Sequence, residues 1–264
     1  MTASGTSATP TLNEITIVPR TPPPRDWGRA WGAIKILVAD SERTDQVFEL
    51  LDALGGPCDE ESFQAFIHDP KGQRQLVERP DLLAVLSDHE SLRALPEGSL
   101  GRAYLAFMEE AGLNARDLID AEKAVVSAQA DLDPDRRWLA DRGRDSHDLW
   151  HVLTGYGRDE AGEVALLAFT YALYPNPGIG IILLAASLIG PKTLSFRFER
   201  YLRQAYRRGK AAELDFAPYE EWLSLPLEEA RRRAGIVPPE VAHPGVDILV
   251  ANREGSTTAF RLRP

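Results

Sequence analysis

Apolar residues recur at intervals of three and four along most of the chain, which is the spacing of an amphipathic helix. The pattern begins at Trp27, and a second run of this kind ends at Leu54. We expect that run to end at residues 55–57, Gly-Gly-Pro, because glycine and proline are poor helix residues. Further helices are predicted over residues 61–68, 72–78, 98–111, 114–129, 134–154, 160–174, 178–189, 193–213, 218–224 and 227–234. The pattern therefore predicts an all-α protein, a multi-helix orthogonal bundle.

Both ends of the chain depart from this helical pattern. Residues 1–26 are rich in Pro, Ser and Thr and predict an extended arm, with one weakly alternating segment around Ile15. Residues 246–250 and 258–262 alternate on either side of a turn that contains glycine, which predicts a β-hairpin that the arm could join. We therefore divide the chain into an arm (1–26), a helical domain (27–240) and a tail (241–264).

Composition narrows the classes of function. The chain has 264 residues, 44% of them hydrophobic, which is ordinary for a folded protein. Its net charge of −10 makes nucleic acid an unexpected partner. Cys58 is its only cysteine, so an intramolecular disulfide and a multi-cysteine zinc module are both excluded. The longest uncharged apolar run, residues 178–190, is shorter than the roughly 20 residues of a spanning helix, and we expect no secretory signal.

The segment from His147 to Glu163 holds the residues with the clearest chemistry. His147 and His151 are four residues apart, so on a helix their rings lie on one face and can bind one metal ion. Asp148 shares part of that face. Glu163 could join them only if the chain turns between the two segments, and the glycines at 155, 157 and 162 favour such a turn. Zn²⁺, Fe²⁺ and Mn²⁺ all suit such ligands, but the same spacing also occurs in helices whose histidines are merely structural.

The order of these residues resembles a known signature. His147, Asp148, His151 and Glu163 match the H-D-x-x-H…E pattern of the Coq-four family of ubiquinone (coenzyme Q) biosynthesis proteins. The resemblance runs from about residue 34 to residue 236. Other segments that resemble this family are residues 95–104, 151–156, 218–222 and 226–231.

The resemblance implies a specific function. It implies an all-helical protein that binds a divalent metal, zinc before iron or manganese, through His147, Asp148, His151 and Glu163. It implies a decarboxylase (lyase) that replaces the C1 carboxyl group of a polyprenylated hydroxybenzoate by hydroxyl. It also implies partners among the other ubiquinone biosynthesis enzymes and a peripheral place on a membrane. That membrane is the cytoplasmic face in a bacterium or the matrix side of the mitochondrial inner membrane in a eukaryote. We also expect a homo-oligomer.

Two segments are candidates for lipid contact. Residues 164–174 and 178–189 are apolar on nearly every side, and small residues such as Ala185 leave room for a prenyl tail, although a buried core helix has the same pattern. The next predicted helix, over residues 193–213, has one basic and one apolar stripe. Such a basic stripe is typical either of a solvated face or of contact with anionic headgroups. The basic stripe consists of Arg197, Arg200, Arg203 and Arg207.

Two hypotheses of different class follow. The first is a metal-dependent enzyme, and the second is a lipid-binding scaffold that organises other enzymes around a structural metal. The coordination sphere distinguishes them, because an open ligand position favours catalysis and four protein ligands favour a structural ion.

Overall fold

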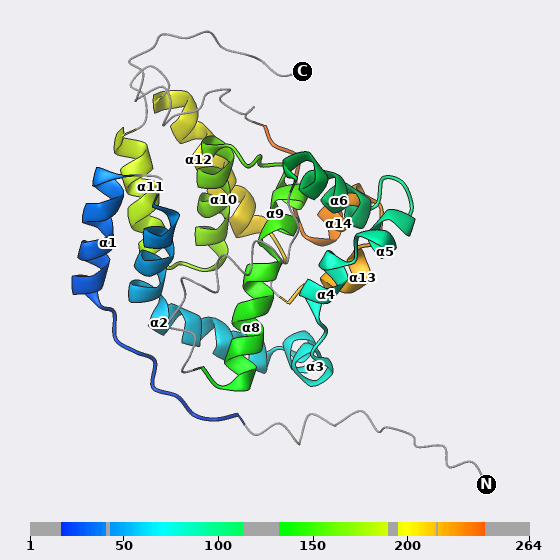
Figure 1. Cartoon of the computed structure of the whole chain (residues 1–264), viewed down its shortest axis with the longest axis horizontal. Helices are drawn as coiled ribbons and strands as arrows, with labels where there is room; N and C mark the ends of the chain where they lie inside the picture. The colour runs from blue at the N-terminus through cyan, green and yellow to red at the C-terminus, as the bar shows by residue number, and fades with distance from the viewer. Residues whose placement is uncertain (1–16, 41–42, 113–131, 190–194, 215, 241–264) are drawn as a thin grey trace.

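The computed structural model describes residues 17–40, 43–112, 132–189, 195–214 and 216–240, and these form an all-α bundle (Figure 1). The predicted fold class is confirmed, since the described residues contain helices and a single isolated bridge between Ser99 and Pro226. The predicted helix at 114–129, the strand around Ile15 and the hairpin in the tail lie outside the described residues. The helices are α1 (Trp27–Ala39), α2 (Thr44–His68), α3 (Pro70–Glu78), α4 (Leu82–Ser87), α5 (His89–Ala94), α6 (Leu100–Ala111), α8 (Pro134–Asp145), α9 (His147–Thr154), α10 (Glu160–Leu173), α11 (Pro177–Ile189), α12 (Ser195–Ala211), α13 (Tyr219–Trp222) and α14 (Leu227–Arg233).

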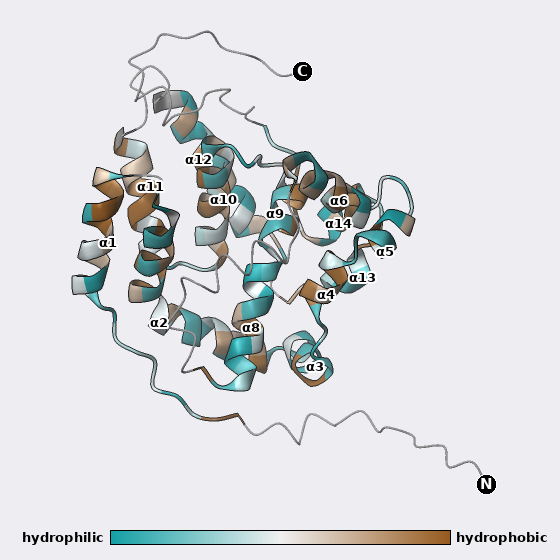
Figure 2. Ribbon diagram, viewed as in Figure 1, coloured by the Kyte–Doolittle hydropathy of each residue, from teal (hydrophilic) through white to brown (hydrophobic). Residues whose placement is uncertain are grey.

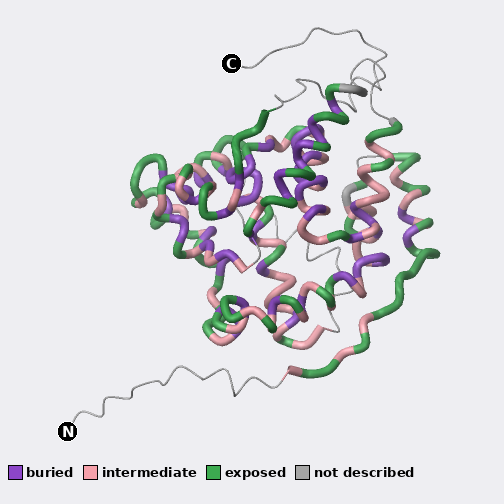
Figure 3. Tube along the Cα trace, turned by 180° about the vertical axis from the view of Figure 1, so that it is seen from behind, coloured by how far each residue is buried: buried purple, intermediate pink, exposed green. Residues whose placement is uncertain are grey.

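The main hydrophobic core lies where α9 and α10 meet α6, α12, α13 and α14. Leu153 on α9 and Phe169 on α10 are fully buried there, and in Figure 3 the buried residues gather along these helices. A smaller cluster joins α1 to α2 through Ala30, Ala33 and Leu54, with isoleucines of α11 packed against it. The main cluster therefore anchors α9 and α10, which carry the predicted metal ligands.

The predicted helix end at residues 55–57 is wrong, because α2 continues through them from Thr44 to His68. Pro57 has no N–H to donate to the carbonyl oxygen of Ala53, which would leave that oxygen without its helical partner. The backbone N–H of Asp26 donates to this oxygen instead, at 2.8 Å. Gly56 leaves room for the same arm, since a Cβ there would come within 2.6 Å of the Pro23 carbonyl oxygen. The Gly-Gly-Pro sequence therefore allows residues 17–26 to pack directly against the backbone of α2.

The predicted helix over 134–154 is two helices, α8 and α9, which meet at Ser146. The predicted turn beyond α9 is confirmed. The C-cap residue Gly155 has φ 76°, a conformation that glycine adopts without a steric cost, and α10 begins five residues later at Glu160. This turn folds α10 back toward α9. The short helices α4 and α5, which the apolar pattern did not predict, connect α3 to α6.

An exposed apolar surface follows α1 and α11, which lie side by side against α2 (Figures 1 and 2). Trp27, Trp31 and Val38 are exposed on α1, and Leu184 and Leu188 are exposed on α11. Within the described part of the chain, we find no helix whose length and apolar character would let it cross a membrane.

Candidate metal centre

The two histidines of α9 occupy different environments although they share one face of the helix. His151 is 1% exposed, and its Nδ1 lies 3.0 Å from the carbonyl oxygen of Tyr156 in the α9–α10 turn. Because a carbonyl oxygen can only accept, this contact places the ring proton on Nδ1 and leaves the Nε2 lone pair free. The Nε2 of His147, whose side chain is half exposed, lies 3.2 Å from the Nε2 of His151. Both ligand nitrogens therefore meet at one point beside α9.

Glu163 reaches the same point from the first turn of α10. The Asp159 side chain caps that helix by accepting from the backbone N–H groups of Ala161 and Gly162. One carboxylate oxygen of Glu163 lies 3.3 Å from Nε2 of His151, and the other lies 3.7 Å from Nε2 of His147. Burial raises the pKa of Glu163, but its contacts with His147 and His151, which favour the ionised carboxylate when these rings are protonated, outweigh burial and bring the pKa to about 2. The site is therefore an anionic carboxylate facing two imidazoles.

The spacing of these donor atoms fits a single divalent ion. One nitrogen from each histidine and one oxygen of Glu163 all lie within 4.8 Å of one another. Four ligands placed tetrahedrally at the usual Zn–N distances of about 2.0–2.1 Å are separated by about 3.3–3.4 Å. The separations of 3.2 to 3.7 Å between the donor atoms are close to this edge length. The residues present can therefore hold a metal through His147, His151 and Glu163.

Asp148, the fourth predicted ligand, does not belong to this group in the described structure. Its carboxylate pairs with Arg158, at 3.2 Å. The helix explains the difference: His147 and Asp148 lie on opposite sides of His151, since four residues rotate by about +40° and three by about −60°. The side of α9 that carries Asp148 faces Arg158, and the side that carries His147 faces α10.

The residues predicted for lipid contact lie on two successive helices, α11 and α12. Arg197, Arg200, Arg203 and Arg207 are exposed on α12, and the apolar stripe of that helix is buried. Ala185 is half-buried on α11.

Two arginines that the sequence pattern did not assign to the site stabilise the helix that carries the histidines. Arg208 donates to the carbonyl oxygen of Thr154 at 2.8 Å, and Arg231 donates to those of Val152 and Leu153, each at 2.9 Å. The last carbonyls of a helix have no intrahelical partner, so these guanidinium groups stabilise the end of α9. A basic residue that lies distant in sequence from the helix it completes gives no local pattern to recognise.

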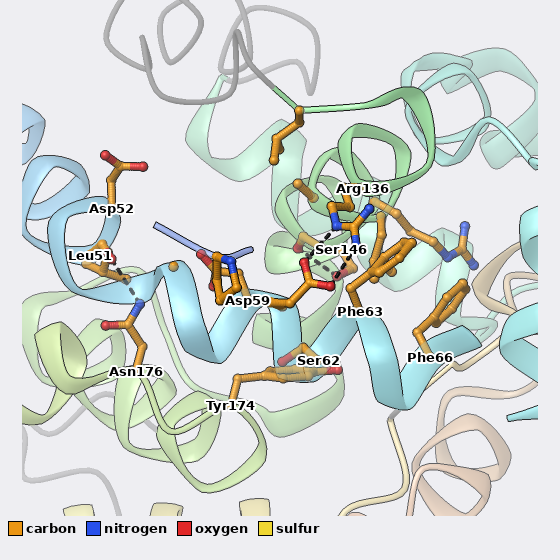
Figure 4. A pocket seen from close by; sticks show the side chains of 18 of the residues that line it. Leu51, Asp52, Asp59, Ser62, Phe63, Phe66, Arg136, Ser146, Tyr174 and Asn176 are labelled. Atoms are coloured by element: carbon orange, nitrogen blue, oxygen red, sulfur yellow. Dashed lines mark hydrogen bonds and ion pairs between the residues drawn. The ribbon is translucent and has the colours of Figure 1, made fainter. Parts of the chain in front are cut away.

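A cavity of about 680 Å³ lies on a different face of α9, between α2, α8 and the arm (Figure 4). Trp150 of α9 and Tyr174 beyond α10 contribute to its wall, and Ala185 does not. Arg136, labelled in Figure 4, also lines the cavity, and its guanidinium donates to the carboxylate of Glu60 at 2.6 and 2.7 Å. The predicted prenyl channel between α10 and α11 is therefore separate from this cavity and stays a prediction.

The fold and the site together define a class: an α-helical protein with two imidazoles and one carboxylate poised around one point. Residues 28–240 match the family described as "Coenzyme Q (ubiquinone) biosynthesis protein Coq4". The chain belongs to this family of ubiquinone biosynthesis proteins.

Similar proteins agree with this assignment. The chain is 32% identical to the mitochondrial ubiquinone biosynthesis protein COQ4 of Yarrowia lipolytica, over 76% of this chain and 75% of that protein. It is also 32% identical to the corresponding protein of Aspergillus terreus, over 66% of this chain but only 59% of that protein. A crystal structure of a Nostoc punctiforme protein, assigned to ubiquinone biosynthesis, superposes with a TM-score of 0.57 at 24% identity. The match covers 79% of this chain and 97% of that one, and it supports the fold.

Proposed function

We propose that this chain is a metal-dependent enzyme of ubiquinone biosynthesis, with a divalent ion held by His147, His151 and Glu163. The observation that carries the proposal is the convergence of two Nε2 atoms and one carboxylate at separations of 3.2 to 3.7 Å. Three protein ligands leave a coordination position open, as in catalytic rather than structural metal sites. The side chains of His147 and Glu163 are 48% and 42% exposed, so a substrate can approach from solvent.

The proposed overall reaction is an oxidative decarboxylation: the C1 carboxyl group of a polyprenylated hydroxybenzoate leaves as CO₂ and a hydroxyl group takes its place, with one O₂ consumed for every two rings converted. A divalent ion in this site supplies positive charge that stabilises negative charge on a ring carboxylate or phenolic oxygen. The chain contributes the orientation: the Tyr156 carbonyl fixes the His151 ring, and the Asp159 cap fixes the turn of α10 that carries Glu163. Zinc fits the donor spacing, whereas two histidines and one carboxylate also suit Fe²⁺ in oxygen-dependent enzymes.

Elemental analysis of the purified chain, followed by turnover of a prenylated hydroxybenzoate under air, tests this proposal. We expect one bound divalent ion per chain and loss of both metal and turnover in His147→Ala, His151→Ala and Glu163→Gln. Stoichiometric metal in either histidine variant would remove that residue from the ligand set. A metal-loaded chain without turnover would favour the scaffold hypothesis, in which the ion is structural and other ubiquinone biosynthesis enzymes are the partners.

Contact with a membrane surface is a second part of the proposal. The exposed leucines of α11 precede α12, whose exposed arginines face outward. Each basic residue near an anionic surface contributes about 1 kcal/mol to binding. Arg200→Glu combined with Arg203→Glu should therefore lower sedimentation with phosphatidylserine vesicles, with neutral phosphatidylcholine vesicles as the control. Equal sedimentation of variant and parent would show that these arginines form an ordinary solvated face without a role in membrane binding.

A further inference from the structure

Asp148 lies beside the proposed metal ligands in sequence, but its carboxylate is engaged elsewhere. Its Oδ1 accepts from Nη2 of Arg158 at 3.2 Å, and the two side chains are only 18% and 22% exposed. Arg158 belongs to the turn between α9 and α10, two residues after Tyr156. The ion pair therefore ties α9 to the turn that orients His151 and leads to Glu163.

Arg158 extends this connection to α6. Its guanidinium donates to the carbonyl oxygen of Phe107 at 3.2 Å and contacts the sulfur of Met108 at 2.9 Å. The guanidinium carbon also lies 3.8 Å from the centroid of the Phe107 ring. That ring stacks on the imidazole of His151, with centroids 5.5 Å apart and planes 27° apart. A continuous series of contacts thus runs from Asp148 through Arg158 and Phe107 to His151.

We infer that Asp148 is a positioning residue of the metal site and not a fourth ligand. Its ion pair with Arg158 holds the α9–α10 turn and the Phe107 ring, and these hold the imidazole of His151 with Nε2 toward Glu163. For Asp148 to bind the ion, it would have to leave the mostly buried guanidinium of Arg158 without its carboxylate, which is costly. The inference rests on the proposed metal site, and it leaves that site with three protein ligands and an open position.

Arg158→Met distinguishes a positioning role of Asp148 from a role as a metal ligand, because the two roles predict changes of Zn²⁺ affinity in opposite directions. Removing a cation near the ion, and freeing Asp148 to act as a ligand, would both leave Zn²⁺ affinity unchanged or increase it. Loss of positioning lowers the affinity, and changes in groups that orient metal ligands typically cost 10- to 100-fold. We expect Zn²⁺ binding, measured by competition with a chelator at pH 7.5, to weaken at least about tenfold.

Two further variants complete the test. Asp148→Asn, which is nearly isosteric, should lose a similar factor, and the double variant should be no weaker than either single one. At saturating Co²⁺ the d–d absorption of Asp148→Asn should match the wild type, because the same three side chains bind the ion. Arg74→Met is the matched control, since it removes the same charge from exposed pairs with Glu78 and Glu221, on α3 and α13.

The outcomes are distinct. Wild-type or tighter Zn²⁺ binding by Arg158→Met, or a changed Co²⁺ spectrum in Asp148→Asn, would overturn the positioning role while leaving the metal site intact. A wild-type chain that binds Zn²⁺ no better than His151→Ala would overturn the metal site itself, and the positioning role with it. Circular dichroism and thermal melts of the metal-free variants verify that each is folded, and Arg158→Lys, which keeps the charge, should recover part of the affinity.

Discussion

A group of polar side chains lies on each of two sides of α9, and the difference between the two groups lies in where their polar atoms point. On the face toward α10, the nitrogens of His147 and His151 and the carboxylate of Glu163 turn toward a common point. On the face toward α2, the cavity is far more conspicuous, yet its charged side chains mostly neutralise each other. Arg136 is bound by Glu60 and Asp133.

The volume of a cavity alone therefore does not identify a metal-binding site. Inside the cavity, the ion pairs contribute to the cohesion of α2, α8 and the arm, since Arg136 also donates to the carbonyl oxygen of Val18 at 3.1 Å. At the metal centre, the two imidazole nitrogens and the Glu163 carboxylate are brought within 3.2 to 3.7 Å of one another. The first arrangement suits structure, and the second suits a bound cation.

The largest effect on stability should come from the cavity face. Arg136→Met leaves the carboxylate of Glu60 buried without its main partner, and breaking a buried pair costs about 3–5 kcal/mol. Urea denaturation of the metal-free chain measures this loss. Arg29→Met is the matched control, because its pairs with Glu49 and Asp52 are largely exposed and should cost about 1 kcal/mol or less. We expect Zn²⁺ affinity of the folded Arg136→Met chain to equal that of the wild type, and a parallel loss would show that the two faces are coupled.

The two histidines should differ in stability although they agree in metal binding. His151→Ala removes a buried ring and leaves the Tyr156 carbonyl oxygen without its donor, so the metal-free chain should lose about 2 kcal/mol. His147→Ala removes a half-exposed ring and should change the free energy of unfolding by less than about 0.5 kcal/mol. Equal destabilisation by both variants in urea would contradict the burial difference between the two rings.

The smallest expected effect concerns Asp59, whose carboxylate faces the cavity near Asn176 (Figure 4). Burial and, to a lesser degree, the negative charge of Asp52 raise its pKa from the ordinary 3.8 to about 6, against the opposing charge of Arg20. The ionised form is therefore disfavoured in the folded state, and the destabilising contribution of Asp59 should disappear as the pH falls from about 7 toward 4.

Asp59→Asn removes this titration. Because the Asp59 side chain is still accessible to solvent, we expect a gain of only about 1 kcal/mol at pH 8 and none at pH 4. Urea denaturation at the two pH values measures the difference. A variant that is less stable than the wild type at pH 8 would show that the carboxylate makes a favourable interaction in the cavity, which would bring this face closer in character to the metal centre.

The sequence by itself determined the parts of the molecule that depend on local geometry. The period of the apolar residues predicted the all-α class, because a helix that buries one face needs an apolar residue every three or four positions. The spacing of His147 and His151 placed two rings on one face for the same reason. The glycine-rich stretch that begins at Gly155 predicted the turn that returns Glu163, since a glycine C-cap commonly ends a helix.

Only the tertiary structure decided which neighbours those residues meet. Asp148 follows His147 directly, but its partner Arg158 became evident only when the turn and α6 were packed together. Residues 55–57 looked like a helix end because the sequence does not show the N–H of Asp26 that replaces the one Pro57 lacks. Such partners come from other segments of the chain, and a local pattern cannot report the free energy of contacts that exist only after folding.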